Sequence, residues 1–433
     1  MAQYAASEFD SPEPNVPRHY AWVVFALTFG LLVSDYMSRQ VLNAVFPLLK
    51  AEWQLSDTQL GSLAGIVALM VGLLTVPLSL LADRWGRVKS LTVMAMLWSL
   101  ATLICGLSNS FSEMLGARFF VGIGEAAYGS VGIAVVLSVF PARMRATIAA
   151  AFMAGGMFGS VLGMGTGGVL AEHFGWRWAF GGMALYGLAL GCLYPLIVRE
   201  SRIAPAVNPT SAPKNRGKRS SLRSLYGSRS VVCAYIGSGL QLFVGASMMA
   251  WIPSFMNRYY AMGTDKAGLV AAIFVLICGT GTVVCGMLSD RLCRHNPDQK
   301  ITLAITYCLL SCAFLFVGFS LSAGMAQLVL IGLGMFLATG TNGPAGAMVA
   351  NLTHAAIHGT AFATLTLVNN LLGLAPGPFI TGLLADQLGL GPAMAMVPLI
   401  SVVAAMVFFY AKMHYQLDIA RVRDCDTALV CQA

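Results

Sequence analysis

The sequence predicts an all-α membrane protein in which twelve transmembrane helices form two pseudo-symmetric six-helix bundles. Three observations support this prediction: the composition, a series of long apolar runs, and an internal repeat. Of the 433 residues, 57% are hydrophobic and 10% are charged, and the mean hydropathy is +0.74. Soluble domains carry about 25% charged residues. The composition therefore excludes a soluble globular protein and a disordered chain.

Apolar runs separated by short polar segments predict the individual helices. A helix needs about 20 apolar residues to cross a bilayer. Suitable runs cover residues 21–46, 60–82, 91–107, 114–140, 145–170, 178–198, 230–256, 267–289, 301–322, 324–350, 359–384 and 393–411. The first run follows a tail without the basic flank or cleavage site of a signal peptide. We therefore expect this run to stay in the protein as a transmembrane helix.

The distribution of basic residues predicts the orientation. With both termini in the cytoplasm, 20 of the 26 Lys and Arg residues lie in cytoplasmic segments, four lie in outer loops, and Arg39 and Arg118 lie within spans. Cytoplasmic loops of membrane proteins carry the excess of Lys and Arg. The net charge of +8 is thus a sign of topology, and we expect a multi-pass protein of a bacterial inner membrane with no nucleic-acid partner.

The polar segments also predict the domain boundaries. The expected parts are a cytoplasmic tail (1–20), a first bundle (21–198), a basic linker (199–229), a second bundle (230–411) and a cytoplasmic tail (412–433). The linker is rich in Pro, Ser, Asn and basic residues, which is typical of a flexible tether.

An internal repeat joins the two bundles, since residues 145–175 match residues 358–389. The matched pairs include Gly159 and Gly373, Gly163 and Gly377, and Glu172 and Asp386. Small residues four apart let two helix backbones approach closely in lipid. We therefore expect these four glycines to lie at helix crossings.

A second match joins the loop LADRWGRVKS (81–90) to the loop LSDRLCRHNP (288–297). This doubled loop resembles the loop motif of the major facilitator superfamily. The resemblance implies a transporter that works by alternating access, with an inner gate made of an Asp–Arg network. The gate residues would be Asp83, Arg84, Arg87, Asp290 and Arg291. The alternative is that these charges only anchor the loops on the cytoplasmic side.

Short segments resemble the Spinster-type branch of this superfamily: GIGEAAYG (122–129), GASMMAWIPSFMNR (245–258), NGPAGA (342–347) and GLAPGPFITGLLAD (373–386). Known members of that branch carry lysophospholipids or sphingosine phosphate. The anion:cation symporters for sugar acids and aromatic acids share the Gly-Glu-Ala element. Both branches usually place an Asp-Arg pair in the first span, where this chain has Ser38-Arg39. Either Asp35, one turn earlier, replaces that proton site, or coupling relies on Glu125 or is lost.

Asp35 and Arg39 lie deep in the first span, and Arg118 and Glu125 lie deep in the fourth. Ionisable groups within a membrane are expensive to bury and usually face a wet cavity. We expect the four to form one cluster, in which the carboxylates exchange protons while the arginines pair with them or with an anionic substrate. Ser38 is a further substrate-contact candidate. The alternative is a static buried ion pair that holds the two spans together.

The second bundle lacks these charges, because Met335 and Leu328 occupy the positions that match Glu125 and Arg118. We therefore expect it to supply much of the apolar substrate surface. Candidate cavity-lining residues in the two bundles are Tyr36, Tyr128, Trp251, Phe336, Asn342, Asn369 and Asn370. The alternative for each is helix packing.

The expected function is secondary active transport of a small organic anion or anionic amphiphile, as a symporter or antiporter coupled to protons. Two alternatives remain at this point: a proton-driven exporter of drugs, siderophores or other neutral or cationic amphiphiles, and a multipass sensor. An enzyme is not expected, because no nucleophile–base pair or metal cluster is apparent. We expect no metal, no cofactor besides the coupling proton, and a monomer in the lipid bilayer.

Overall fold

The computed structural model describes residues 16–203, 227–293, 299–353 and 357–430, and the regular elements of this part are helices. Twelve of them, counting broken helices as one, are long and apolar enough to cross a membrane, as predicted. The first half comprises α2 (Arg18–Trp53), α3 (Asp57–Trp85), α4 (Arg87–Leu107), α5 (Phe111–Glu125), α6 (Tyr128–Val139), α7 (Arg145–Phe174) and α8 (Trp176–Ile197).

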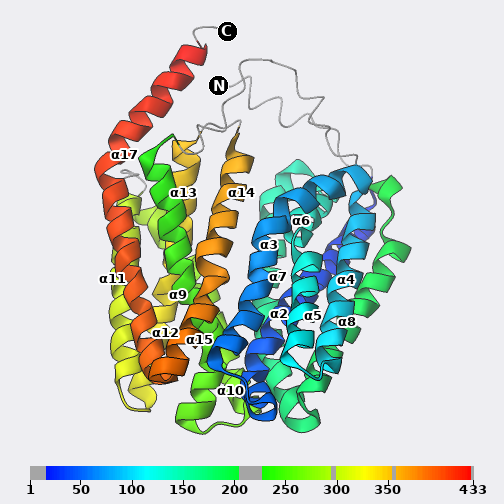
Figure 1. The fold of residues 1–433 in the computed structure, drawn as a ribbon. Coiled ribbons are helices and arrows are strands. Elements are labelled where there is room, and N and C mark those ends of the chain that lie inside the picture. The colour runs from blue at the N-terminus through cyan, green and yellow to red at the C-terminus, as the bar shows by residue number, and fades with distance from the viewer. Residues whose placement is uncertain (1–15, 204–226, 294–298, 354–356, 431–433) are drawn as a thin grey trace.

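The second half comprises α9 (Arg229–Tyr260), α10 (Thr264–Leu292), α11 (Gln299–Ser320), α12 (Met325–Ala338), α13 (Asn342–Leu352), α14 (His358–Val368), α15 (Pro376–Leu388), α16 (Leu390–Met396) and α17 (Ile400–Val430). Figure 1 shows these helices on the left of the view and those of the first half on the right. Short non-α segments interrupt four spans: residues 126–127, the 3₁₀ turn η4 (Thr339–Thr341), the π-helix η6 (Asn369–Leu374) and the 3₁₀ turn η7 (Val397–Leu399).

The helices extend beyond the predicted apolar runs because polar residues cap their ends. Ser56 and Gln59 form a capping box at the start of α3, which adds a first turn to the run predicted from residue 60. Gly175 ends α7 at φ 89° and Gly389 ends α15 at φ 86°, at matching positions of the repeat. Glycine adopts this backbone conformation without steric penalty. At the other end of the chain, α17 continues past residue 411, where the last run was expected to end.

Successive spans alternate in direction, so the molecule has two faces. We call the face on which α2 begins and α8 ends the terminal face, and the face on which α2 ends and α3 begins the opposite face. The start of α9 also lies on the terminal face. The opposite face holds the tight turns at residues 54–56, 108–110 and 261–263.

Glycines set the closest approaches between helices in both halves. A Cβ atom added to Gly159 would lie 2.6 Å from the Val33 carbonyl oxygen, and one on Gly163 would lie 2.8 Å from Met37 Cα, so α7 crosses α2 here. Gly373 and Gly377 approach α9 in the same way, with Gly239 O at 2.7 Å and Phe243 O at 2.8 Å. The four glycines of the repeat therefore lie at matching helix crossings.

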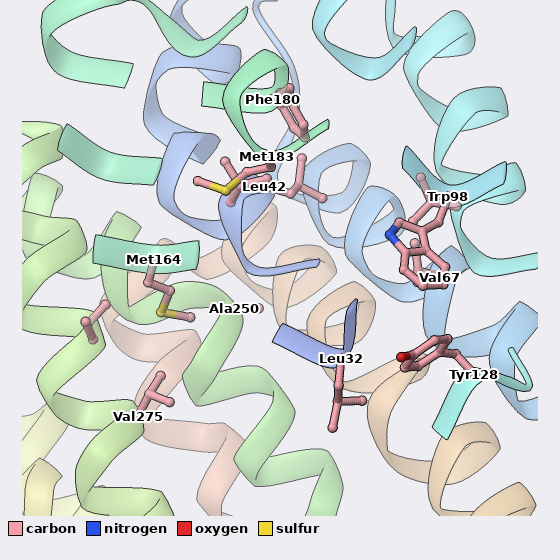
Figure 2. Close-up of a cluster of buried hydrophobic side chains, with 14 of the residues drawn as sticks. Leu32, Leu42, Val67, Trp98, Tyr128, Met164, Phe180, Met183, Ala250 and Val275 are labelled. Carbon is pink, nitrogen blue, oxygen red and sulfur yellow. The ribbon is translucent and has the colours of Figure 1, made fainter. Parts of the chain in front are cut away.

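Buried apolar side chains form one large cluster that includes residues of both halves, such as Met164 of α7 and Val275 of α10 (Figure 2). A smaller cluster fills the space between α9, α11, α13 and α17. Crossings between the halves are also close. A Cβ atom on Gly168 would lie 2.6 Å from Thr264 O, and one on Gly268 would lie 2.7 Å from Met164 O.

Candidate substrate cavity and charge cluster

A cavity of about 370 Å³ lies between the two halves. The first half supplies its charged side chains and most of its polar ones, together with apolar residues such as Val67, Met153 and Met157, and the second half lines it mainly with apolar ones. Contributions from the first half include Tyr36, Arg39, Gln40, Asn43, Arg118 and Ser160. Contributions from the second half include Leu242, Ala246, Met249, Val275, Thr339 and Asn342. The cavity therefore has one charged wall and one largely apolar wall.

Arg39 links the cavity to two buried carboxylates. Its Nε donates to Glu125 Oε2 at 2.6 Å and to Asp35 Oδ1 at 3.2 Å. The Asp35 and Glu125 residues are each 2% exposed, whereas 21% of the Arg39 side chain is exposed. The guanidinium also lies 5.4 Å from the centre of the Tyr36 ring. Arg39 is thus the member of this cluster that reaches the cavity, with the carboxylates behind it.

The charges in this cluster are not balanced. Two carboxylates share one guanidinium, and the two carboxyl groups lie within hydrogen-bonding reach of each other. Oε1 of Glu125 is buried and accepts no hydrogen bond from the described residues. A net negative charge in such a site is costly. One added proton would neutralise the cluster and could bridge the two carboxyl groups.

Arg118 lies apart from this cluster, which corrects the expected group of four paired charges. Its Nη1 donates to Ser38 O at 2.9 Å and its Nε donates to Leu63 O at 3.2 Å. Within the described ranges it forms no ion pair, although it is only 1% exposed and lines the cavity. Arg118 and Glu125 are seven residues apart on one helix, about 10.5 Å along the axis. No ion pair joins the two side chains in the described ranges.

The predicted cavity-lining residues fall into two groups. Tyr36 and Asn342 line the cavity. Tyr128 instead donates to Thr28 O at 2.6 Å. Its ring packs edge-to-face on Trp98, and Figure 2 shows both side chains. Trp251 Nε1 donates to Pro378 O at 3.0 Å within the second half. These two aromatic side chains are fully buried, and each links two neighbouring helices by a hydrogen bond to a backbone carbonyl.

Phe336, Asn369, Asn370 and Ser38 also lie outside the cavity wall. The two asparagines begin the π-helix η6, and Asn370 Nδ2 donates to Thr366 O at 2.9 Å. Ser38 Oγ donates to Ser34 O, so only its backbone carbonyl takes part in the site, by accepting from Arg118.

Sequence reasoning missed Gln40 and Asn43, which line the cavity beside Tyr36 and Arg39. Positions 36, 39, 40 and 43 share one helical face. That polar stripe within an apolar span was the available signal.

The predicted inner-gate residues lie on the terminal face and contact their own halves. Arg87 Nε lies 3.4 Å from Asp83 Oδ1, and Lys300 Nζ lies 2.7 Å from Asp290 Oδ1. Arg84 and Arg291 form no ion pair with any residue that the structure describes. In this conformation the gate charges do not join the two halves.

On the opposite face, by contrast, charged side chains bridge the halves. Asp57 at the start of α3 accepts from Lys50 at 2.6 Å and from the Arg258 guanidinium of α9 at 2.6 and 2.8 Å. Asp386 of α15 accepts from the backbone amides of Asp57 and Thr58 at 2.7 and 2.8 Å. We call these contacts, together with the one described next, the opposite-face latch.

The latch has a second, symmetry-related part. Glu172 at the end of α7 accepts from the backbone amide of Thr264 at 2.9 Å, at the start of α10. Glu172 and Asp386 are matched residues of the repeat, so each half caps a helix of the other half in the same way. The halves are thus held together at the opposite face and not by the gate charges at the terminal face.

Comparison with known proteins identifies the family. The family model described as "Major Facilitator Superfamily" matches residues 28–378. The chain belongs to this superfamily. Members with this fold are membrane transporters and not enzymes, and the chain is accordingly a multi-pass transporter.

Within the superfamily, the chain is 25% identical over 428 residues to a protein of Mycolicibacterium smegmatis named MFS-type efflux pump, covering 96% of this chain and 98% of the relative. It is 24% identical over 424 residues to the sphingosine-1-phosphate transporter SPNS2 of Danio rerio, covering 90% and 84%.

A crystal structure of a bacterial homolog of the human lysosomal transporter Spinster, inward-facing and unoccupied, superposes with a TM-score of 0.84 at 19% identity, covering 93% of this chain and 99% of that one.

Proposed function

We propose that this protein is a proton-coupled secondary active transporter that moves an organic anion or an anionic amphiphile by alternating access. The observation that carries the proposal is the buried Asp35–Arg39–Glu125 cluster, whose arginine opens onto a cavity that also holds Arg118. Ionisable groups kept inside a membrane domain usually serve transport rather than stability.

The charge balance of the cluster supports a proton as the coupling ion. Arg39 alone neutralises part of the negative charge of two carboxylates. When an anion binds to Arg39, this positive charge is no longer available to Asp35 and Glu125. A proton on Asp35 or Glu125 then restores neutrality. Proton binding and anion binding therefore favour one another, and such a coupling is reciprocal. This gives Asp35 the role that the missing carboxylate at Ser38 would otherwise have.

The cavity chemistry supports an anionic, amphipathic cargo. Arg39 and Arg118 present two guanidinium groups on the first half, and Arg118 has no carboxylate partner among the described residues. The facing wall contains Leu242, Met249 and Val275. An anionic headgroup fits the first wall and an apolar chain or ring fits the second. Sphingosine phosphate, the cargo that the name of a relative states, has this chemistry.

The two faces support alternating access. The latch closes the opposite face here, while the gate residues Asp83 and Asp290 stay apart on the terminal face. In the other state, opening of the latch would accompany assembly of the gate. We assign the terminal face to the cytoplasm of the inner membrane, because it carries the basic loops. One chain supplies both walls of the cavity, so a monomer suffices.

Export of a neutral or cationic amphiphile is the second candidate. Met153, Met157 and Met249 line the cavity, and flexible methionine side chains accommodate varied apolar ligands. The relative named as an efflux pump also favours it.

An uptake experiment with purified protein in liposomes separates the candidates. The probes are a lysophospholipid, a sugar acid, an aromatic acid and a cationic dye, each with a matched neutral analogue. We expect an anionic probe to be transported and to compete with the other anions. Transport of the dye alone would instead establish the exporter.

A further inference from the structure

A second cavity, of about 330 Å³, lies at the terminal face of the first half and takes no part in the proposed transport chemistry. It forms where the start of α2 meets the end of α6 and the 3₁₀ turn η1 (Ala142–Met144). Its walls include Arg18, Trp22, Phe140, Arg143 and Met144. The cavity therefore combines two cations with aromatic and aliphatic surface.

The two arginines of this cavity are available for a ligand. Arg18 and Arg143 are exposed, and neither forms an ion pair with a carboxylate in the part of the chain that the structure describes. Guanidinium groups bind phosphate oxygens through charged, often bidentate hydrogen bonds. Two unpaired guanidinium groups in one cavity thus fit a phosphate group.

The aromatic wall indicates that the ligand has an apolar part. Trp22 is 51% exposed, and its ring packs edge-to-face on Phe140 at 5.3 Å and on Phe25 at 5.8 Å. Phe25 in turn stacks on Phe29 at 5.7 Å. Residues 22, 25 and 29 share one face of α2, so an aromatic stripe leads from the cavity along the helix toward its membrane-embedded part.

The position of the cavity matches the boundary between lipid and water. It lies at the first turns of α2, where this span leaves its apolar stretch. Tryptophan is enriched at membrane interfaces, and basic residues at the same depth attract anionic headgroups. We propose that this cavity binds an anionic phospholipid of the surrounding bilayer, with Arg18 and Arg143 on the phosphate and the acyl chain along Trp22, Phe25 and Phe29.

Trp22 provides a direct optical test. The full chain is placed in phosphatidylcholine liposomes that contain increasing fractions of phosphatidylglycerol with brominated acyl chains, which quench nearby tryptophan. The Trp22 signal is the difference between the wild type and Trp22→Phe. We expect it to be quenched at low fractions of brominated phosphatidylglycerol. Brominated phosphatidylcholine should need a fraction at least about tenfold higher for the same quenching.

Charge variants distinguish a specific lipid-binding site from general attraction of anionic lipid to a basic face. Arg18→Gln with Arg143→Gln should abolish the preference for phosphatidylglycerol, and the Lys pair at the same positions should keep most of it. The matched control removes two exposed cations elsewhere on the terminal face, by Arg199→Gln with Lys412→Gln. This control should keep the preference.

Three outcomes would overturn the proposal. Equal loss in the control pair would show diffuse attraction, and equal quenching by both lipids in the wild type would show no headgroup selectivity. A preference that emerges only after residues 1–15 are deleted would assign the cavity to that segment, which carries Glu8, Asp10 and Glu13.

Discussion

The two halves share their helix crossings and their helix-end contacts but differ in the charge of their cavity walls. Gly163 brings α7 against α2 as Gly377 brings α15 against α9. Glu172 caps α10 as Asp386 caps α3. No such correspondence exists for Glu125, whose matched residue in the second half is Met335, 1% exposed and apolar.

This difference separates two tasks within one duplicated fold. The repeated features, the glycine crossings and the caps, are those that any rocking motion of two bundles needs. The unrepeated features, Asp35, Arg39, Arg118 and Glu125, are those to which we assign the selection of an ion or a cargo in the proposed mechanism. Substitutions in the first group should therefore change which state is populated, whereas substitutions in the second group should change what is carried.

Replacement of Arg39 should have the largest effect. Arg39→Gln leaves Asp35 and Glu125 buried without a cation, and removing one partner of a buried ion pair costs about 3–5 kcal/mol. Transport should be lost and the melting temperature lowered. The deficit should shrink as the pH falls, because protonation removes the unpaired negative charges. Thermal unfolding of the purified variant between pH 8 and pH 5 measures this.

A deficit of Arg39→Gln that stays constant over this pH range would contradict the unbalanced cluster. Gln40→Ala, one position along the same cavity wall, serves as the control and should show no pH-dependent deficit.

Replacement of Arg118 should weaken the binding of an anionic cargo and leave the affinity for its neutral analogue unchanged. Hydrogen bonds to a charged group contribute about 1.5–3 kcal/mol, so Arg118→Ala should raise the dissociation constant for the anion about tenfold to a hundredfold. Calorimetric titration of both ligands measures the difference. An unchanged affinity for the anion would mean that Arg118 only ties α2 and α3 together through Ser38 O and Leu63 O.

The sequence predicted the spans well because each depends on a local run of apolar residues. It also predicted that Asp35, Arg39 and Glu125 have one environment, since isolated charges in lipid are costly. It could not predict that Arg118 turns to backbone carbonyls of α2 and α3, because that depends on how three helices pack. Tyr128 was misplaced for the same reason, since spacing alone does not show which face of a helix meets the cavity.

The latch was missed because its members lie far apart in the chain. Asp57 and Arg258 are separated by 201 positions, and each resembles an ordinary loop charge. The repeat did pair Glu172 with Asp386, but only the structure shows that both cap a helix of the other half.

Loss of a latch cap should shift the conformational equilibrium moderately. Removing a helix cap costs about 1 kcal/mol, so Asp386→Ala should increase the population open at the opposite face about fivefold. Glu172→Ala should have a similar effect because the contacts are related by the repeat. Spin labels at positions 109 and 322, exposed on the opposite face of the two halves, report the distance between them. Unchanged distance distributions in both variants would exclude the latch.

Replacement of Asn342 should have an equally small effect, confined to the binding of cargo. It is a neutral polar residue on the cavity wall of the second half. One neutral hydrogen bond contributes about 1 kcal/mol to binding. Asn342→Ala should therefore weaken cargo binding about fivefold and leave the pH dependence of transport intact. A change in pH dependence as large as that of a first-half variant would remove the distinction between the halves.

The central claim is tested most directly by uptake into proteoliposomes with and without an imposed pH gradient, comparing the wild type with Glu125→Gln and with Met335→Gln at the matched position. The wild type and Met335→Gln should accumulate cargo when the gradient is imposed. Glu125→Gln should show no response to the gradient while it still exchanges labelled for unlabelled cargo. An undiminished response of Glu125→Gln to the gradient would contradict proton coupling through the Asp35–Arg39–Glu125 cluster.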